Sequence, residues 1–128
     1  MGKKVLIAED QPDSRQLLED ILEKFHPYGV RVFTAQDGAE AYEIALRELP
    51  DLILLDIMMP GMTGYEICEK VKANPETANT YIIMVSAKTQ QEDRKQAAQV
   101  GADEYVTKPF DIHFVLERVG AALDVKPI

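Results

Sequence analysis

Five short apolar runs recur along the chain, and a longer amphipathic stretch follows each of them. The apolar runs occupy residues 4–8, 30–35, 52–56, 81–87 and 104–108. Most are rich in valine, isoleucine and leucine, which is typical of strands buried on both faces of a parallel sheet. The stretches of helical length occupy residues 13–25, 38–48, 64–73, 90–100 and 111–123. Five β-α units in this order predict a doubly wound α/β fold, with helices on both faces and right-handed crossovers.

The ends of the expected helices are marked by residues that cap or break helices. Asn74-Pro75 stops the third helix, Gly101 ends the fourth, and Asp111 is a suitable N-cap for the fifth. The apolar stripe of the first helix is expected to contain Leu17, Leu18, Ile21, Leu22 and Phe25. These signals support one continuous set of β-α units without an internal linker.

Length and charge limit what such a chain can do. A chain of 128 residues is long enough for one domain, which we expect to span residues 1–123 with a tail at 124–128. Its 14 basic and 22 acidic residues give a net charge of −8. Nucleic-acid binding needs clustered Lys and Arg, so direct binding is not expected, whereas a cation or a basic protein partner fits the charge.

Cysteine content and hydropathy indicate a cytoplasmic protein. Cys68 is the only cysteine, so an internal disulfide is excluded. The apolar start of the chain runs directly into Glu9-Asp10, unlike a signal peptide. No run approaches the roughly 18–20 apolar residues needed to span a bilayer, so no membrane association is expected.

Polar side chains follow four of the five expected strands. Glu9 and Asp10 follow the first, Asp56 ends the third, Ser86 lies at the end of the fourth, and Lys108 ends the fifth. In open α/β sheets, ligands bind outside the carboxyl ends of the strands. Three carboxylates there repel one another unless a cation joins them, and an all-oxygen ligand set favours Mg²⁺ over Zn²⁺. The pattern predicts phosphoryl transfer, with Asp56 as the nucleophile that becomes an aspartyl-phosphate, Lys108 as a positive charge for an anion and Ser86 as a hydrogen-bond donor.

Four motifs carry a resemblance to a known family: LIAED (6–10), LILLDIMMPGMTG (52–64), VSA (85–87) and YVTKPF (105–110). Together they resemble the receiver domain of two-component response regulators, and the chain is similar to the single-domain chemotaxis member. The resemblance runs from Lys4 to about Leu123. It implies a flavodoxin-like sheet with strand order 2-1-3-4-5 and a phosphorelay signalling switch rather than an enzyme that turns over an external substrate.

The resemblance also implies roles for individual residues. Asp56 accepts a phosphoryl group from a histidine kinase or phosphotransfer protein. Mg²⁺ is held by Asp10 directly, by Glu9 largely through water, by Asp56 and by the Met58 carbonyl. Lys108 pairs with Asp56 and then with the phosphoryl group.

A second group of implied features concerns the switch. Ser86 moves toward a phosphoryl oxygen, Tyr105 rotates inward, and the Lys108-Pro109 bond is cis. The expected surface for the downstream protein is formed by the fourth helix, the fifth strand and the fifth helix. Met58 and Lys88 offer no obvious base for an attacking water, which predicts slow loss of the phosphate.

Three other functions fit the same fold. A Mg²⁺-dependent aspartyl-phosphate phosphatase usually has an acid two residues after its nucleophile, where this chain has Met58. A flavin or nucleotide binder would need a Gly- or Ser/Thr-rich loop in place of EDQPDS (9–14). A receiver-like scaffold that is never phosphorylated is also compatible with the sequence.

Overall fold

The computed structural model describes residues 2–87 and 91–127. Within them, five parallel strands form one sheet in the order β2-β1-β3-β4-β5. The strands are β1 Lys4–Ala8, β2 Arg31–Ala35, β3 Leu52–Asp56, β4 Tyr81–Ser86 and β5 Glu104–Thr107. The helices are α1 Pro12–Glu23, α2 Gly38–Glu48, α3 Gly64–Ala73, α4 Gln91–Gln99 and α5 Ile112–Leu123, with a short 3-10 helix η1 at His26–Tyr28. The predicted doubly wound fold and its strand order 2-1-3-4-5 are confirmed.

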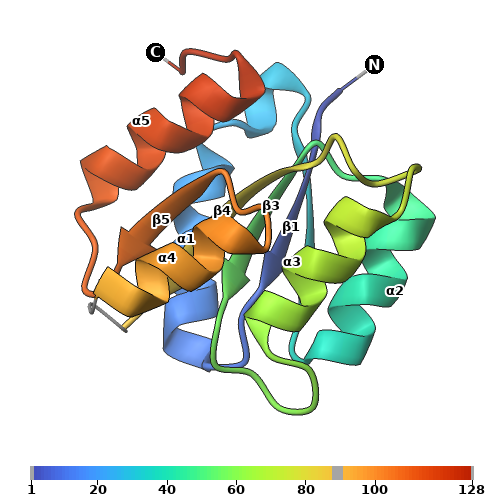
Figure 1. The fold of residues 1–128 in the computed structure, drawn as a ribbon. Helices are drawn as coiled ribbons and strands as arrows, with labels where there is room; N and C mark the ends of the chain where they lie inside the picture. Colours follow the sequence, from blue (N-terminus) through green and yellow to red (C-terminus); the bar gives the residue numbers. More distant parts are fainter. Residues whose placement is uncertain (1, 88–90, 128) are drawn as a thin grey trace.

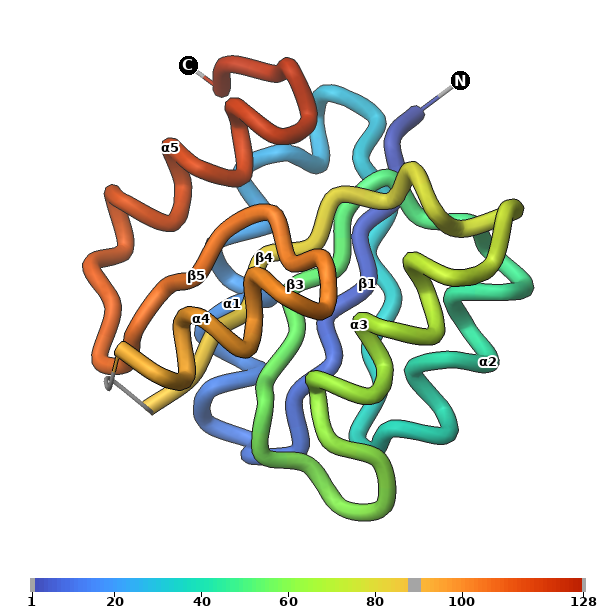
Figure 2. Tube along the Cα trace, viewed as in Figure 1, coloured from blue at the N-terminus to red at the C-terminus, as the bar shows by residue number. Residues whose placement is uncertain are grey.

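Helices cover both faces of the sheet (Figure 1). Apolar side chains of α1 and α5 pack on one face, and those of α2, α3 and α4 pack on the other. β3 lies in the middle of the sheet and all five of its residues are buried. Its apolar side chains therefore form part of both cores, which explains the unbroken run Leu52–Leu55 before Asp56. Both ends of the described chain lie at the amino end of the sheet, far from the carboxyl ends of the strands (Figure 2).

Local capping fixes where several helices begin. The Asp111 side chain accepts a hydrogen bond from the His113 backbone N–H at 2.8 Å, so the predicted cap of α5 is confirmed. Thr63 and Glu66 form a reciprocal capping box at the start of α3. This box places the amino end of α3 directly after the loop that follows Asp56, and so helps to shape the site.

The first helix differs from its predicted form in two ways. α1 ends at Glu23, not at residue 25, because the chain turns through η1, which contains Pro27, and then through Gly29 at φ 83°. Leu17 is 37% exposed and does not belong to the buried stripe, because it lies outside the face formed by Leu18 and Leu22. In the described part of the chain, every helix is too short or too polar to cross a membrane.

Candidate functional site

The carboxyl ends of four strands bring the predicted site residues to one edge of the sheet. Glu9 and Asp10 directly follow β1, and Asp56 is the last residue of β3. Because β1 and β3 are neighbours, the acid pair lies beside Asp56. Ser86 ends β4, and Lys108 follows β5.

The three carboxylates form a compact, largely buried cluster. Glu9, Asp10 and Asp56 each offer a carboxylate oxygen within 4.8 Å of the others. Glu9 is 1% exposed and Asp56 is 5% exposed. Asp10 Oδ1 is buried and has no hydrogen-bond partner among the described residues. Such a group is costly to bury, so this oxygen favours a cation as its missing partner.

Lys108 is the positive charge inside the cluster. Its Nζ lies 2.6 Å from Glu9 Oε1 and 3.7 Å from Asp56 Oδ2. The pairing with Asp56 expected from the resemblance is therefore present, but the contact with Glu9 is the shorter one. Lys108 is held in place from its backbone, where its N–H donates to the Ser86 carbonyl at 2.7 Å. Among the residues that the structure describes, one ammonium group faces three carboxylates, which leaves an excess of negative charge.

This charge excess changes the acidity of Asp56. Burial raises the pKa of Asp56, and the neighbouring Glu9 carboxyl raises it further. The Lys108 charge and the Met58 backbone N–H, which donates to Asp56 Oδ1 at 3.3 Å, both oppose the rise. The net result is a pKa of about 7. A second positive charge near the cluster would favour the ionised, nucleophilic form.

The loop between β3 and α3 holds the backbone of Met58 near the cluster. The Gly64 N–H donates to the Ile57 carbonyl at 2.8 Å and closes the loop. A Cβ at Gly64 would lie 2.5 Å from the Asp56 carbonyl oxygen, so a side chain does not fit there. Gly61 has φ 79°, a left-handed conformation that glycine adopts without strain. The two glycines of the Pro-Gly-x-x-Gly motif thus have separate structural roles.

Ser86 and Tyr105 lie on neighbouring strands beside the cluster. Ser86 is fully buried, and the half-buried Tyr105 forms a side-chain hydrogen bond with it. Burial raises the pKa of Tyr105, and this hydrogen bond opposes the rise. The Lys108-Pro109 bond is cis, as the resemblance implied. Lys88 lies outside the described residues.

Two arginines near the site were missed by sequence reasoning. Arg15 on α1 donates from Nη1 to the carbonyl oxygens of Glu9 and Asp10, at 3.1 and 3.5 Å. It thereby holds the loop that carries the acid pair. Arg94 on α4 lies over the Tyr105 ring, with Cζ 4.9 Å from the centroid. A basic residue five positions after Asp10 is the available signal for Arg15, but nothing in the sequence connects Arg94 with Tyr105.

The donor set fits a hard divalent cation. The ligand atoms offered by Glu9, Asp10 and Asp56 are all carboxylate oxygens, and one of them lacks any other partner in the described structure. Oxygen ligands of this kind suit Mg²⁺, which also keeps waters and binds phosphate oxygens.

Comparison with known proteins places these features in a family. The model of the response regulator receiver domain matches residues 5–120. The chemotaxis protein CheY4 of Vibrio cholerae is 31% identical, with TM-score 0.84 over 96% of this chain and 100% of that one. The signal receiver domain of a DNA binding response regulator protein from Colwellia psychrerythraea is 26% identical, with TM-score 0.88 over 95% of this chain and 98% of that one.

A third similar structure is that of the receiver domain of the sensor histidine kinase PA1611 from Pseudomonas aeruginosa. It is 28% identical, with TM-score 0.85 over 97% of this chain and 99% of that one, and has a magnesium ion coordinated in its active site cleft. The fold, the motif order and the family match agree over nearly the whole chain. The chain therefore belongs to the response regulator receiver domain family of two-component signalling systems.

Proposed function

We propose that the protein is a phosphorylation-controlled switch in which Asp56 accepts a phosphoryl group from the phosphohistidine of a histidine kinase or phosphotransfer protein. The observation that carries this proposal is the largely buried cluster of Glu9, Asp10 and Asp56 around the Lys108 ammonium group. An Asp56 carboxylate oxygen forms the new bond to phosphorus as the bond from phosphorus to the histidine nitrogen breaks. The electron pair of that bond stays on the departing imidazole.

Magnesium is the cation that best fits this proposal. The carboxylates of Glu9, Asp10 and Asp56 would hold it with the Met58 carbonyl, Asp10 directly and Glu9 largely through water. When bound, Mg²⁺ offsets the negative charge that gathers on the transferred phosphoryl group. The buried, unpartnered Asp10 Oδ1 supports this assignment.

Lys108 and Ser86 are proposed to contact the phosphoryl group. The Lys108 ammonium already lies within 3.7 Å of Asp56 Oδ2, so it can follow the charge from the carboxylate to a phosphoryl oxygen. The Ser86 hydroxyl is a suitable donor to a second oxygen. Its hydrogen bond with Tyr105 would then be replaced, which links the chemistry to the position of the Tyr105 ring.

The output is proposed to be a protein contact made by α4, β5 and α5. Tyr105 lies in β5 and touches Arg94 of α4, so a change at Ser86 can reach this surface through two side chains. The net charge of −8 disfavours direct contact with nucleic acid. We further propose a cytoplasmic protein whose receiver domain spans residues 1–123, with a tail at 124–128.

Labelling with acetyl phosphate tests the proposed function. We expect intact-mass analysis to find one added phosphoryl group in the presence of Mg²⁺ and none in EDTA. Asp56→Asn should abolish the uptake, whereas the matched control Asp20→Asn, on the exposed face of α1, should keep it. Equal uptake by Asp56→Asn would overturn the assignment, and no uptake by the unaltered protein would favour a scaffold that is not phosphorylated.

A turnover assay with a small phosphomonoester distinguishes the proposed switch from a phosphatase. Met58 is 59% exposed and stands where such enzymes usually have an acid, so no side chain there protonates a leaving group. We expect no multiple turnover of a small phosphomonoester and a slow loss of phosphate from Asp56. A phosphate half-life of only seconds in the purified protein would contradict the second expectation.

A further inference from the structure

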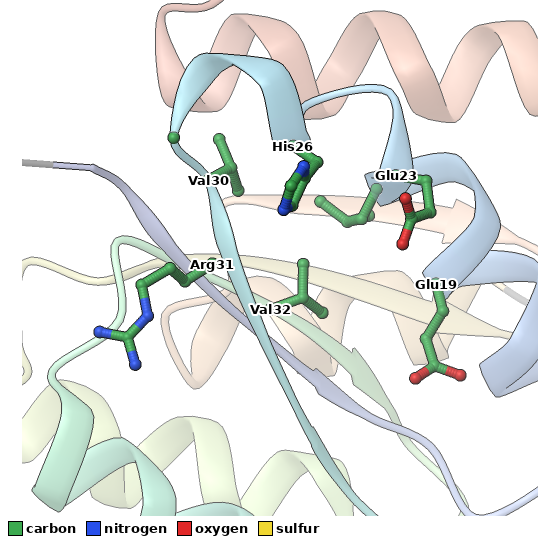
Figure 3. Close-up of a pocket in the computed structure, with 8 residues that line it drawn as sticks. Glu19, Glu23, His26, Val30, Arg31 and Val32 are labelled. Carbon is green, nitrogen blue, oxygen red and sulfur yellow. The ribbon is translucent and has the colours of Figure 1, made fainter.

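A groove beside the open edge of the sheet has no role in the proposed phosphoryl transfer. It lies between the last turn of α1, η1 and the amino end of β2, and its volume is about 490 Å³ (Figure 3). Leu22, Val30 and Val32 form its apolar part, and Glu19, Glu23 and His26 form its polar wall. The groove is at the end of the molecule opposite the acidic cluster.

The backbone of β2 is available for pairing along this groove. β2 is an edge strand with β1 as its neighbour. The Arg31 N–H donates to the Lys3 carbonyl and the Ala35 carbonyl accepts from the Glu9 N–H, so residues 31, 33 and 35 turn their backbone groups toward β1. Because backbone groups alternate along a strand, Val32 and Thr34 turn theirs away from the sheet. An extended segment can therefore add a strand at this edge.

The groove carries two acidic side chains that form no ion pair with the residues that the structure describes. Glu19 and Glu23 are one turn apart on α1, and both line the groove on its α1 side (Figure 3). Within residues 2–87 and 91–127, neither forms an ion pair. Arg31 also lines the groove, but its side chain points away from the two glutamates, and its Cζ lies 5.3 Å from the centroid of the Phe33 ring. Like charges at this spacing destabilise a helix, so a basic partner relieves a repulsion that the fold leaves in place.

The spacing of these groups defines the partner. Glu19 and Glu23 are about 6 Å apart along the axis of α1, at 1.5 Å per residue. Alternate side chains of an extended strand are about 6.6 Å apart and lie on the same face. A strand paired to β2 with lysine or arginine at two alternate positions would therefore bring one cation to each carboxylate.

We propose that this groove binds an extended basic segment of a partner protein, which adds to the sheet as a strand beside β2. A second copy of this chain is a poorer occupant, because it brings a net charge of −8. Its own β2 has one cation, Arg31, and not two at alternate positions. The proposal is independent of phosphoryl transfer at Asp56, since the groove lies at the amino end of β2 and the acidic cluster at the carboxyl ends of its neighbours.

Fluorescence anisotropy with a labelled six-residue peptide tests the proposal. The peptide has lysine at its second and fourth positions and alternating valine and threonine elsewhere. The control peptide has the same composition with the two lysines adjacent, so that they face opposite sides of a strand. We expect the first peptide to bind at least about tenfold more tightly. Equal binding of the two peptides would mean unspecific charge attraction and would overturn the proposal.

Two kinds of variant separate the contributions of charge and backbone. The double variant Glu19→Gln/Glu23→Gln should weaken binding by about fivefold to tenfold, whereas the matched control Glu69→Gln/Glu76→Gln on the far side of the molecule should not. Val32→Pro removes an outward N–H and should abolish binding. Thr34→Pro removes the next outward N–H and serves if Val32→Pro does not fold, as judged by circular dichroism. Undiminished binding by a folded proline variant would exclude strand addition.

Two further measurements distinguish strand addition from an effect of phosphorylation and from self-association. Binding should be the same in Asp56→Asn as in the unaltered protein, so a failure of the proposed phosphoryl transfer does not affect this test. Size-exclusion chromatography of the chain alone should give a monomer at the concentrations used. If the unaltered chain is a dimer and the Val32→Pro variant is a monomer, a second copy of the chain occupies the β2 edge. That result would overturn the proposal.

Discussion

The carboxyl and amino ends of the sheet both gather charged side chains, but their hydrogen bonding differs. At the amino end, Lys72 Nζ donates to the Thr80 carbonyl at 2.7 Å and to Asp103 Oδ2 at 3.1 Å. Asp103 Oδ2 also accepts from the Ile82 N–H at 2.8 Å. At the carboxyl end, Lys108 is shared by two carboxylates, and Asp10 Oδ1 has no partner among the described residues.

This difference separates structural from functional polar groups. The Lys72 and Asp103 side chains complete backbone hydrogen bonds at strand starts and pair with each other, so these two charges are matched within the described chain. Within the described part of the chain, the carboxyl-end groups form an excess of negative charge that Lys108 does not fully neutralise. A ligand can therefore stabilise the second set and not the first, and this contrast can be tested by measuring stability and phosphorylation side by side.

Magnesium binding should produce the largest change in the free energy of unfolding. At about 100 times its dissociation constant, Mg²⁺ should raise the free energy of unfolding by about 2.7 kcal/mol, because it binds the folded carboxylate cluster and not the unfolded chain. Chemical denaturation with and without EDTA measures this. Asp103→Asn, at the amino end, should respond like the unaltered protein, whereas Asp10→Asn should respond much less. An equal response of Asp10→Asn would remove that residue from the metal site.

Replacement of Lys72, at the amino end of the sheet, should have the second-largest effect on the free energy of unfolding. Lys72→Met leaves the Thr80 carbonyl without its lysine donor and removes the ion pair with Asp103, which keeps its hydrogen bond from the Ile82 N–H, so we expect the free energy of unfolding to fall by about 2 kcal/mol. Lys95→Met, on the exposed surface of α4, is the matched control and should change it little. Phosphoryl uptake from acetyl phosphate by folded Lys72→Met should be normal. Loss of that uptake would mean that the two ends are coupled.

Asp56→Asn should stabilise the protein in a pH-dependent way. The pKa of Asp56 rises from 3.8 to about 7 on folding, with burial as the main cause, so the folded protein binds more protons between these values. The stability of the unaltered protein in EDTA therefore falls as the pH increases through this window. The Asp56→Asn variant has no carboxyl group to ionise there, so its stability does not fall in this window. At pH 8 it should be more stable than the unaltered protein by about 1–2 kcal/mol. Denaturation at pH 4 and pH 8 measures the difference, and the same difference at both values would contradict the assigned cause.

A buried hydroxyl at the amino end should have the smallest effect. The Thr80 side chain donates to the Pro50 carbonyl at 2.9 Å. Thr80→Val removes this bond with little change of shape, so we expect a loss of about 1 kcal/mol in thermal or chemical unfolding. Phosphoryl uptake should again be unchanged. A fall of more than about 3 kcal/mol in the free energy of unfolding is more than the removal of one hydrogen bond explains. It would indicate that the loop between α3 and β4 is rearranged.

Sequence patterns predicted the strands and helices well because most of these signals are local. The apolar run before Asp56 indicated a doubly covered strand, and Asp111 indicated the start of α5. The end of α1 was placed too late, because a helical apolar pattern continues to Phe25 while the backbone already turns through η1. The partner of Lys108 and the contact between Arg94 and Tyr105 depend on side-chain packing between distant segments, which periodicity does not report.

The sequence by itself determined the order of β-α units, and with it the gathering of Glu9, Asp10, Asp56 and Lys108 at one edge, because parallel strands end on the same side of a sheet. Only the tertiary structure decided how those charges pair. It placed Lys108 nearer to Glu9 than to Asp56, left Asp10 Oδ1 buried without a partner in the described chain, and set Glu19 and Glu23 beside an open strand edge. Electrostatic interactions depend on distances of a few ångströms between groups far apart in the chain, and those distances exist only once the core has packed.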